Sequence, residues 1–392
     1  MTQTVVHVIT ALGQGGAEAV LGRLVSNPSD SKFEHVVVSL CGGDETLKAR
    51  LEAAGVRVIV LGIRPGSIDP RMILKLARVL RREHPDVVQT WMYHADLVGG
   101  LAARLAGSPP VAWNIRNGTL TPAFSKRLTV LTARVNARVS RRLPKVIVCC
   151  AESAKQIHVE LGFPADRIVV IPNGYDLDRF RAQPLARKAI RAAAGIPENA
   201  LVIGMVARFH PQKDHQTFFA AAALVRSRFD NVHFLLCGDK VVDGNPELRA
   251  LIEQAGVADR THLLGSRDDI PAIQSSLDVA CMASQGGEGF PNAVAEAMAC
   301  ETPCAVTDVG DAALIVGETG RVVPSGNAPA LAEAFTELLN LSQGERAHLG
   351  MQARQRIADR YDIREFARRY EELYDKLAGN ARSTSWAFGT SD

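Results

Sequence analysis

Residues 279–299 read VACMASQGGEGFPNAVAEAMA and contain the three parts of one strand–loop–helix unit. The apolar run at 279–282 predicts a short, fully buried strand. Gly289 and Pro291 predict a turn, and the alanine-rich run after them has a strong helix propensity, with Asn292 as the expected cap. A strand that leads into a helix through such a loop is typical of a parallel α/β sheet.

Two carboxylates, Glu288 and Glu296, bracket the predicted turn and the start of this helix. The free amide groups and the dipole of a helix start attract phosphate groups, whereas carboxylates accept hydrogen bonds from hydroxyl groups. The spacing therefore suits a sugar linked to a diphosphate. On the spacing alone, two solvated glutamates at an ordinary loop–helix junction are an equally acceptable interpretation.

Apolar strands alternate with helices along the whole chain, in two series. The first series of predicted strands is 5–9, 35–40, 56–61, 86–90, 111–114 and 146–150, and the second is 201–206, 232–237, 261–264, 279–282 and 304–307. The turn-rich segment 171–174 between the series is the expected hinge. This pattern predicts an α/β protein of two doubly wound parallel-sheet domains that face a central cleft, with ligands at the carboxyl ends of the strands.

These features predict four parts of the chain: an N-terminal domain (1–175), a C-terminal domain (176–360), a C-terminal helix (361–378) and a disordered tail (379–392). In the helix, Phe366, Tyr370 and Tyr374 are four residues apart and therefore share one stripe. We expect this stripe to pack against a domain surface. The tail is polar, which favours fraying.

The bulk composition excludes several classes of protein. The net charge of +3 over 392 residues is too small for a dedicated nucleic-acid binder. The seven cysteines include no CxxC pair, so buried reduced thiols are expected, and a zinc site is not. We find neither a signal peptide nor a membrane span, which predicts a cytoplasmic protein.

The segment Gly13-Gln14-Gly15-Gly16-Ala17-Glu18 follows the first predicted strand. It resembles a dinucleotide-binding fingerprint but has Glu18 where glycine or alanine is required, which disfavours a nicotinamide-dependent oxidoreductase. A glycine turn still lets a diphosphate or a sugar approach the backbone of Gly15 and Gly16 closely. A tight turn without a ligand is the alternative.

Three polar residues that follow predicted strands are further candidates for ligand contacts. Arg208 and Lys213 lie five residues apart in one loop, and an arginine fork with a lysine point charge suits a pyrophosphate leaving group. His94 precedes a glycine-containing helix, where a neutral imidazole could bond a sugar hydroxyl. The alternatives are a solvated basic loop and a structural histidine.

The segment 116–145 is rich in basic residues and contains no acid. Arg134, Arg138 and Arg141 recur at helical spacing beside apolar residues, and Arg142 follows them. A basic amphipathic helix is typical of a surface that contacts anionic lipid. We therefore expect a membrane or acceptor surface here, with a solvated face or contact with an acidic polymer as the alternatives.

The ordered blocks of the second half resemble the retaining glycosyltransferases of family 4, which have two Rossmann-like domains in the GT-B architecture. The block EGFPNAVAEAMACETP, residues 288–303, is similar to the signature of that family. The other similar blocks are 206–208 with Lys213, 236–239, 264–271, 307–311 and 320–324. The first half is similar more loosely, at the 13–16 turn, His94 and 171–174.

The resemblance implies a role for each candidate residue. Arg208 and Lys213 would hold the donor diphosphate. Glu296 would accept the ribose hydroxyls, and Glu288 would contact the transferred sugar. The residues to which it assigns donor binding are Gly15, Gly16, Arg208, Lys213, Glu288, Gly289, Phe290, Pro291, Asn292 and Glu296. Those to which it assigns catalysis are Arg208, Lys213, Glu288 and His94. The last helix would cross back to the first domain.

The implied enzyme is a hexosyl or N-acetylhexosaminyl transferase. It would move a sugar from a nucleotide-diphosphate sugar, with a UDP-sugar favoured, to a hydroxyl of a lipid-linked or polysaccharide-precursor acceptor, with retention. No DxD-like motif stands at a strand end, so neither a metal nor another cofactor is expected. The basic segment predicts peripheral contact with the cytoplasmic face of an anionic membrane. A nucleotide-sugar epimerase on the same architecture and a non-enzymatic binding protein are the alternatives.

Overall fold

The computed structural model describes residues 3–13, 15–26, 32–63, 71–118, 120 and 125–379. The chain divides into two compact units. The first unit runs up to Gly174 and takes up the chain again at Ile363, and the second unit is Tyr175–Asp362. The predicted disordered tail, 379–392, lies outside the described residues except for Gly379.

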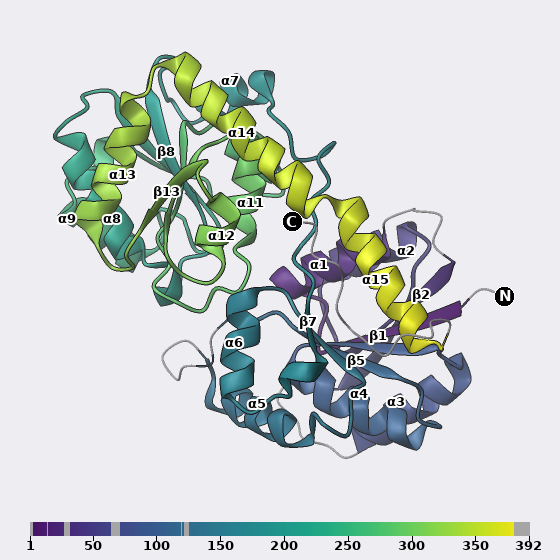
Figure 1. Cartoon of the computed structure of the whole chain (residues 1–392). Helices are drawn as coiled ribbons and strands as arrows, with labels where there is room; N and C mark the ends of the chain where they lie inside the picture. Colours follow the sequence, from purple (N-terminus) through teal and green to yellow (C-terminus); the bar gives the residue numbers. More distant parts are fainter. Residues whose placement is uncertain are drawn as a thin grey trace. The chain divides into compact units, whose positions relative to one another are not determined.

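Within the described residues, seven parallel strands form the sheet of the first unit, in the order β3-β2-β1-β4-β5-β6-β7 (Figure 1). The strands are β1 (Gln3–Ile9), β2 (Phe33–Cys41), β3 (Arg57–Ile63), β4 (Val87–Trp91), β5 (Val111–Ile115), β6 (Val146–Cys149) and β7 (Ile168–Val170). The helices are α1 (Gly16–Val25), α2 (Glu45–Ala53), α3 (Arg71–Glu83), α4 (Tyr93–Leu105), α5 (Arg127–Val139), α6 (Glu152–Glu160) and α15 (Ile363–Leu377).

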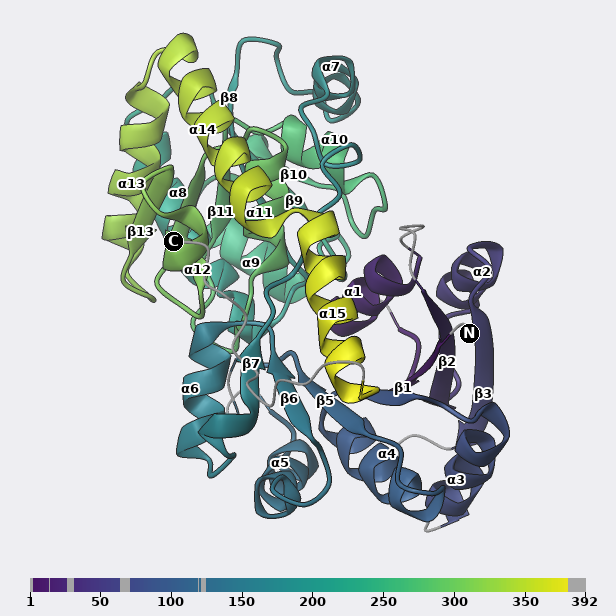
Figure 2. The ribbon, with the colours of Figure 1, turned by 45° about the vertical axis from the view of Figure 1, so that its right-hand side comes forward.

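Helices cover both faces of this first sheet. Within the unit, α3, α4 and α5 lie side by side on one face, and α1 and α15 lie on the other (Figure 2). The core of the second face contains Phe366, Tyr370 and Tyr374 of α15. Asn114 at the end of β5 donates a hydrogen bond to the Tyr370 hydroxyl at 2.8 Å. The aromatic stripe of the C-terminal helix is therefore buried in the first unit.

The sheet of the second unit contains six parallel strands among the described residues, in the order β10-β9-β8-β11-β12-β13. The strands are β8 (Leu201–Val206), β9 (Val232–Cys237), β10 (Thr261–Leu263), β11 (Val279–Met282), β12 (Cys304–Thr307) and β13 (Gly320–Val323). The helices are α7 (Pro184–Ala193), α8 (His215–Arg226), α9 (Pro246–Gln254), α10 (Ile270–Ser275), α11 (Asn292–Ala299), α12 (Ala312–Val316), α13 (Ala328–Asn340) and α14 (Gln343–Tyr361).

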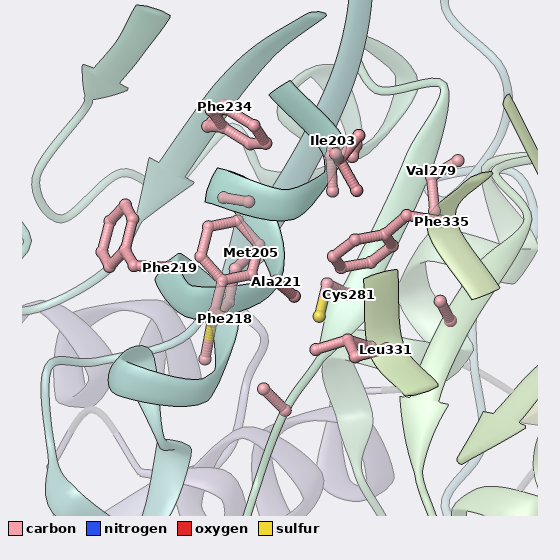
Figure 3. Packing of buried hydrophobic residues seen from close by; sticks show 14 of the residues in the cluster. Ile203, Met205, Phe218, Phe219, Ala221, Phe234, Val279, Cys281, Leu331 and Phe335 are labelled. Atoms are coloured by element: carbon pink, nitrogen blue, oxygen red, sulfur yellow. The ribbon is translucent and has the colours of Figure 1, made fainter. Parts of the chain in front are cut away.

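The core of the second unit lies between this sheet and the helices α8, α9 and α13. Phe218 of α8 is fully buried, and its ring meets those of Phe234 and Phe335 edge-on, with centroid distances of 6.2 Å in both pairs. Figure 3 shows these aromatic rings gathered with Ile203 and Met205 of β8. This packing anchors β8, whose carboxyl end carries candidate site residues.

The predicted fold class is confirmed: both units are Rossmann-like, doubly wound parallel sheets. Two strands, β7 and β13, fall outside the predicted series. Both are edge strands: β7 runs directly into the 171–174 turn, the expected hinge, and Arg321 interrupts the apolar run of β13. Among the described residues, none of the helices combines the length and apolar composition that a membrane span needs.

Candidate donor site

The carboxyl ends of β8 and β11 form the most suitable ligand position in the second unit. The sheet winds from β8 to β9 and β10 in one direction, and through β11, β12 and β13 in the other. In open α/β sheets, ligands bind at the carboxyl ends of the strands where the winding reverses. Lys213 follows β8 and Glu288 follows β11, so two of the predicted site residues reach this one point.

Lys213 and Glu288 form an ion pair at the winding reversal. Lys213 Nζ lies 2.5 Å from Glu288 Oε1, and the Ser284 hydroxyl donates a hydrogen bond to the same oxygen at 2.7 Å. The Glu288 side chain is 9% exposed and that of Lys213 is 22% exposed. Glu288 Oε2 accepts no hydrogen bond within the described part of the chain. The pair is thus held in one geometry while the lysine and one carboxylate oxygen stay available for a ligand.

Neighbouring loops close tightly around Glu288. Gly310, in the loop after β12, has a φ of 64°, and a Cβ there would lie 2.7 Å from the carbonyl oxygen of Glu288 and 2.6 Å from that of Gly289. On the other side, the Gln285 N–H donates to the Gln212 carbonyl at 2.9 Å, which joins this loop to the one that carries Lys213. Only glycine fits at position 310, because any side chain would meet the backbone of the site loop.

The helix α11 begins directly after the site loop and carries Glu296 one turn from its start. The expectation that Asn292 caps this helix is wrong, since Asn292 is the first helical residue and Pro291 holds the cap position. The Asn292 side chain instead accepts a hydrogen bond from the Tyr175 hydroxyl at 2.6 Å. The cap residue Pro291 makes no side-chain hydrogen bond to α11, and the dipole of a helix start suits an anion.

Phe290 anchors the site loop inside the second unit. Its ring stacks on that of Tyr175 with centroids 6.2 Å apart and meets Tyr361 edge-on at 5.1 Å. Phe290 is 7% exposed, so its backbone is a better candidate for the predicted ligand contact than its ring. Tyr175 opens the second unit, and its N–H donates to the carbonyl of Tyr361 at 2.8 Å.

The sequence reasoning missed Tyr175. Its one signal is its position directly after the 171–174 turn, which does not reveal that its hydroxyl reaches Asn292. Two further predicted donor contacts, Arg208 and Glu296, lie on elements already described. Arg208 is exposed two residues beyond β8, and Glu296 is partly exposed on α11.

In the first unit, the winding reverses between β1 and β4, and the Gly15–Gly16 turn follows β1. The carboxylate of Glu18 folds back over this turn, because a Cβ on Gly15 would lie 2.4 Å from Glu18 Oε2. Burial raises the pKa of Glu18, and backbone hydrogen bonds from Glu18 itself and Gly13 oppose that rise. Glu18 therefore belongs to this edge, although the sequence reasoning treated it only as a mismatch to a dinucleotide fingerprint.

His94 stands at the same edge, at the start of α4 after β4. The residue before the helix, Met92, has φ 72° and ψ 160°, a conformation that is costly for a residue with a side chain and is often kept at functional sites. His94 Nε2 lies 3.4 Å from the Thr132 hydroxyl, and burial lowers the pKa of the imidazole. The hydroxyl of the preceding residue, Tyr93, is buried and lies 2.8 Å from His158 Nε2. A neutral ring is thus presented at this edge.

The predicted basic surface contains part of α5 and the turn that follows it. Arg134 and Arg138 are exposed on α5, and Leu131 between them and the helix start is 56% exposed. The expectation that Arg141 continues the helical stripe is wrong, because α5 ends at Val139. Arg141 and Arg142 are exposed in the turn before β6.

Comparison with known proteins links both units to one group of enzymes. The family model Glycosyltransferase Family 4 matches residues 14–179, and the family model Glycosyl transferases group 1 matches residues 200–341. The Escherichia coli UDP-Gal:alpha-D-GlcNAc-diphosphoundecaprenol alpha-1,3-galactosyltransferase is 28% identical over 254 residues, which are 64% of this chain and 65% of that protein. The Campylobacter jejuni N,N'-diacetylbacillosaminyl-diphospho-undecaprenol alpha-1,3-N-acetylgalactosaminyltransferase is 26% identical over 345 residues, 84% of this chain and 89% of that protein.

Solved structures agree with this assignment at the level of the fold. The crystal structure of Anabaena Alr3699/HepE in complex with UDP superposes with a TM-score of 0.83 at 22% identity, over 95% of this chain and 100% of that one. The relatives give no support to the epimerase alternative. Since two family models together match most of both units, this chain belongs to the glycosyltransferases of family 4 and has the GT-B fold.

Proposed function

We propose that this enzyme transfers a sugar, with retention of the anomeric configuration, from a UDP-sugar to a hydroxyl of a lipid-linked or polysaccharide-precursor acceptor. The observation that carries the proposal is the Lys213–Glu288 pair at the winding reversal of the second unit. A cation beside a hydroxyl-accepting carboxylate matches the two ends of a sugar–phosphate bond. Among the described residues, no other ion pair joins the loop after β8 to the loop after β11.

The donor roles follow from the chemistry of each group. Lys213 and Arg208 would neutralise the diphosphate, with the start of α11 beside it. Glu288 Oε2 would accept hydrogen bonds from the transferred sugar, and Glu296, one turn into α11, would accept those of the ribose. Gly289 to Asn292 would contribute backbone contacts.

In the reaction, the bond between the sugar C1 and the phosphate oxygen breaks, and its electron pair passes to the phosphate. Positive charge at Lys213 and Arg208 stabilises this leaving group, an electrostatic contribution that often dominates catalysis. The acceptor hydroxyl then bonds to C1 from the same face and gives its proton to the leaving phosphate oxygen. Glu288 is already paired with Lys213, so it is a poor nucleophile, which favours this route over a covalent intermediate. The cations fill the role of a metal, and we propose metal-independent turnover.

The donor and acceptor classes are supported by the relatives. The names of the Escherichia coli and Campylobacter jejuni enzymes each specify a diphosphoundecaprenol-linked acceptor, and that of the Escherichia coli enzyme specifies UDP-Gal. HepE has been crystallised with UDP-glucose as well as with UDP. In the first unit, we assign contacts with the donor or acceptor to Gly15, Gly16 and His94, because they stand where that sheet reverses its winding.

We further propose peripheral contact with the cytoplasmic face of an anionic membrane through Arg134, Arg138, Arg141 and Arg142. Exposed Leu131 beside exposed arginines on α5 is the combination that interfacial helices use. A lipid-linked acceptor would be met at such a surface.

One experiment tests the central proposal. The purified enzyme is incubated with a panel of nucleotide sugars and membrane lipid extract, with and without a chelator, and the anomeric configuration of the product is read by NMR. Transfer from a UDP-sugar with retention, unaffected by the chelator, is expected. An inverted product would refute the retaining mechanism, and loss of turnover with the chelator would refute metal independence.

Membrane contact is tested separately by flotation with phosphatidylglycerol-containing vesicles. The variant Arg134→Gln/Arg138→Gln should lose most of its vesicle binding, because each cation near an anionic surface changes the affinity by roughly fivefold. Unchanged flotation of this variant would exclude α5 as the docking surface.

A further inference from the structure

A cavity of about 240 Å³ lies in the first unit at the amino ends of β5 and β6, away from both winding reversals. The end of α4, the loop before β5 and the turn before β6 line it, together with Arg167 just before β7. Since ligands of α/β sheets bind at the carboxyl ends of the strands, this cavity does not belong to the donor site.

The cavity concentrates positive charge. Its lining includes five cationic residues: Arg104, Arg141, Arg142, Lys145 and Arg167. The one acidic partner that ion-pairs with them among the described residues is Asp166, 3.8 Å from Arg141, and both of those side chains are more than two-thirds exposed. With five cations against one acidic partner the lining is strongly basic, although the whole chain has a net charge of only +3.

Two of these arginines are held in place by backbone carbonyls. Arg167 donates to the carbonyls of Arg141 at 2.7 Å and Pro144 at 3.0 Å, and Arg104 donates to the carbonyl of Arg142 at 2.7 Å. These bonds fix the turn before β6 as well as the guanidinium groups. The side chains of Arg142 and Lys145 form no ion pair in the described part of the chain, so their charges remain available for an anion.

We propose that this cavity binds the phosphate group of a small anionic ligand. Its volume is below the roughly 300–1,000 Å³ of ordinary small-molecule sites, which excludes a nucleotide sugar and suits a phosphate or a small headgroup. Arginine and lysine are the side chains that bind phosphate best in such clusters.

The headgroup of an anionic phospholipid is the favoured source of that phosphate. The exposed face of α5, with Leu131, Arg134 and Arg138, leads along the chain into Arg141 and Arg142 at the cavity. This assignment of the source rests on the membrane contact proposed above, whereas the phosphate site itself does not.

The phosphate site is tested by titrating the full-length enzyme with inorganic phosphate and with glycerol 3-phosphate by calorimetry. Arg142→Gln/Lys145→Gln should weaken binding tenfold or more, as expected for about two charge-assisted hydrogen bonds. The matched control is Arg50→Gln/Arg360→Gln, which removes the same charge from two exposed arginines outside the cavity. Phosphate bound at the donor loops affects all three proteins equally, so the difference between the two variants reports on the cavity.

A second variant, Ser108→Asp, places a carboxylate in the lining without removing any existing side-chain contact of the five cations. It should also abolish phosphate binding, and Gln343→Glu, on the exposed start of α14, is its control for net charge. If both cavity variants bind phosphate and glycerol 3-phosphate as their controls do, the inference is overturned.

Flotation with phosphatidylcholine vesicles, with and without phosphatidic acid, distinguishes the two sources. Because Arg142 also belongs to the proposed membrane surface, the deciding variant is Ser108→Asp. Weaker binding of Ser108→Asp than of Gln343→Glu to the phosphatidic acid vesicles assigns the lipid headgroup. If the cavity variants lose binding of soluble phosphate but float with the vesicles as their controls do, free phosphate is assigned as the ligand. Suppose that Arg134→Gln/Arg138→Gln loses vesicle binding, whereas the cavity variants still bind both phosphate and vesicles. Membrane contact through α5 would then stand, and the inference of a phosphate site in the cavity would be overturned.

Discussion

The two units share one sheet architecture but present opposite kinds of group where their winding reverses. The second unit presents a charged pair, with Lys213 Nζ 2.5 Å from Glu288 Oε1. The first unit presents Glu18, whose pKa burial raises, and His94, whose pKa burial lowers. Both of those shifts favour the neutral form of the group. The same edge of the same fold thus carries an ion pair in one unit and, in the other, two groups whose pKa values burial shifts toward the neutral form.

This difference suggests how the two units divide the chemistry. The winding reversal supplies a position for a ligand, and the side chains there decide which part of a ligand it suits. Fixed charges suit a diphosphate leaving group, whereas neutral polar groups suit sugar hydroxyls. Two kinds of experiment test this comparison. One removes the charge at the winding reversal of the second unit, and the other asks whether activity depends as strongly on charge in the first unit.

The largest effect is expected for Lys213→Ala. Loss of this cation should reduce kcat by about 100- to 1,000-fold, the usual cost of one group that stabilises developing negative charge. Steady-state kinetics with the UDP-sugar found in the donor screen measure this effect.

The partner residue supplies the control for the lysine. In Lys213→Met/Glu288→Gln, neither residue is left with an unpaired charge, so thermal unfolding should approach that of the wild type while kcat stays low. Recovery of kcat in this double variant would mean that Lys213 serves only to neutralise the charge of Glu288, and that neither charge acts on the donor. Near-normal turnover by Lys213→Ala would remove the diphosphate role altogether.

The next effect compares one glycine from each edge. Gly310→Ala should lower the free energy of unfolding by about 2–3 kcal/mol, because φ is 64° and the new Cβ would meet the backbone of Glu288 and Gly289. Gly15→Ala should cost less than about 1 kcal/mol, because its φ is −96° and the atom in the way is the flexible end of Glu18. Chemical denaturation measures both values. Equal costs would show that the glycine turn of the first unit is as rigid as the donor loop.

The sequence predicts the fold more completely than the site. Apolar strands and the aromatic stripe of α15 are local patterns, so they are visible without a structure. The strand β7 was missed because it runs into the 171–174 turn, and β13 because Arg321 interrupts its apolar run. Lys213 and Glu288 were both identified as candidates, but their pairing joins residues 75 positions apart and depends on which strands are neighbours.

The local errors at the site have the same origin. Asn292 has the right chemistry for a helix cap, and tertiary structure overrides that preference because the Tyr175 hydroxyl engages its side chain. Arg141 has the right spacing to continue a helical stripe, but α5 ends two residues earlier. In both positions, a contact or a helix end beyond the reach of a local pattern decides the outcome.

The pH dependence of stability tests whether burial keeps His158 of the first unit neutral. Burial is the main cause that lowers the pKa of His158 to about 4, from its ordinary value of 6.5, so the unfolded chain binds a proton that the folded chain does not. Stability is therefore complete above about pH 6.5 and falls as the pH drops toward 4, by at most about 1.4 kcal/mol per pH unit for this group. His158→Gln should make the slope of the free energy of unfolding against pH shallower in this window. An unchanged slope would show that His158 is protonated in the folded enzyme.

The smallest effect is expected for the hydrogen bond between Tyr175 and Asn292, next to the site loop of the second unit. Tyr175→Phe removes the hydroxyl that donates to Asn292 at 2.6 Å and keeps the ring that stacks on Phe290, so the free energy of unfolding should fall by about 1 kcal/mol. If this bond positions the site loop, kcat/KM should fall several-fold as well. Tyr361→Phe is the matched control, because its ring also packs on Phe290 but its hydroxyl makes no hydrogen bond within the described part of the chain. A loss of stability without any change in kcat/KM would confine Tyr175 to a structural role, and the donor edge would then be positioned by Gly310 and the Lys213–Glu288 pair alone.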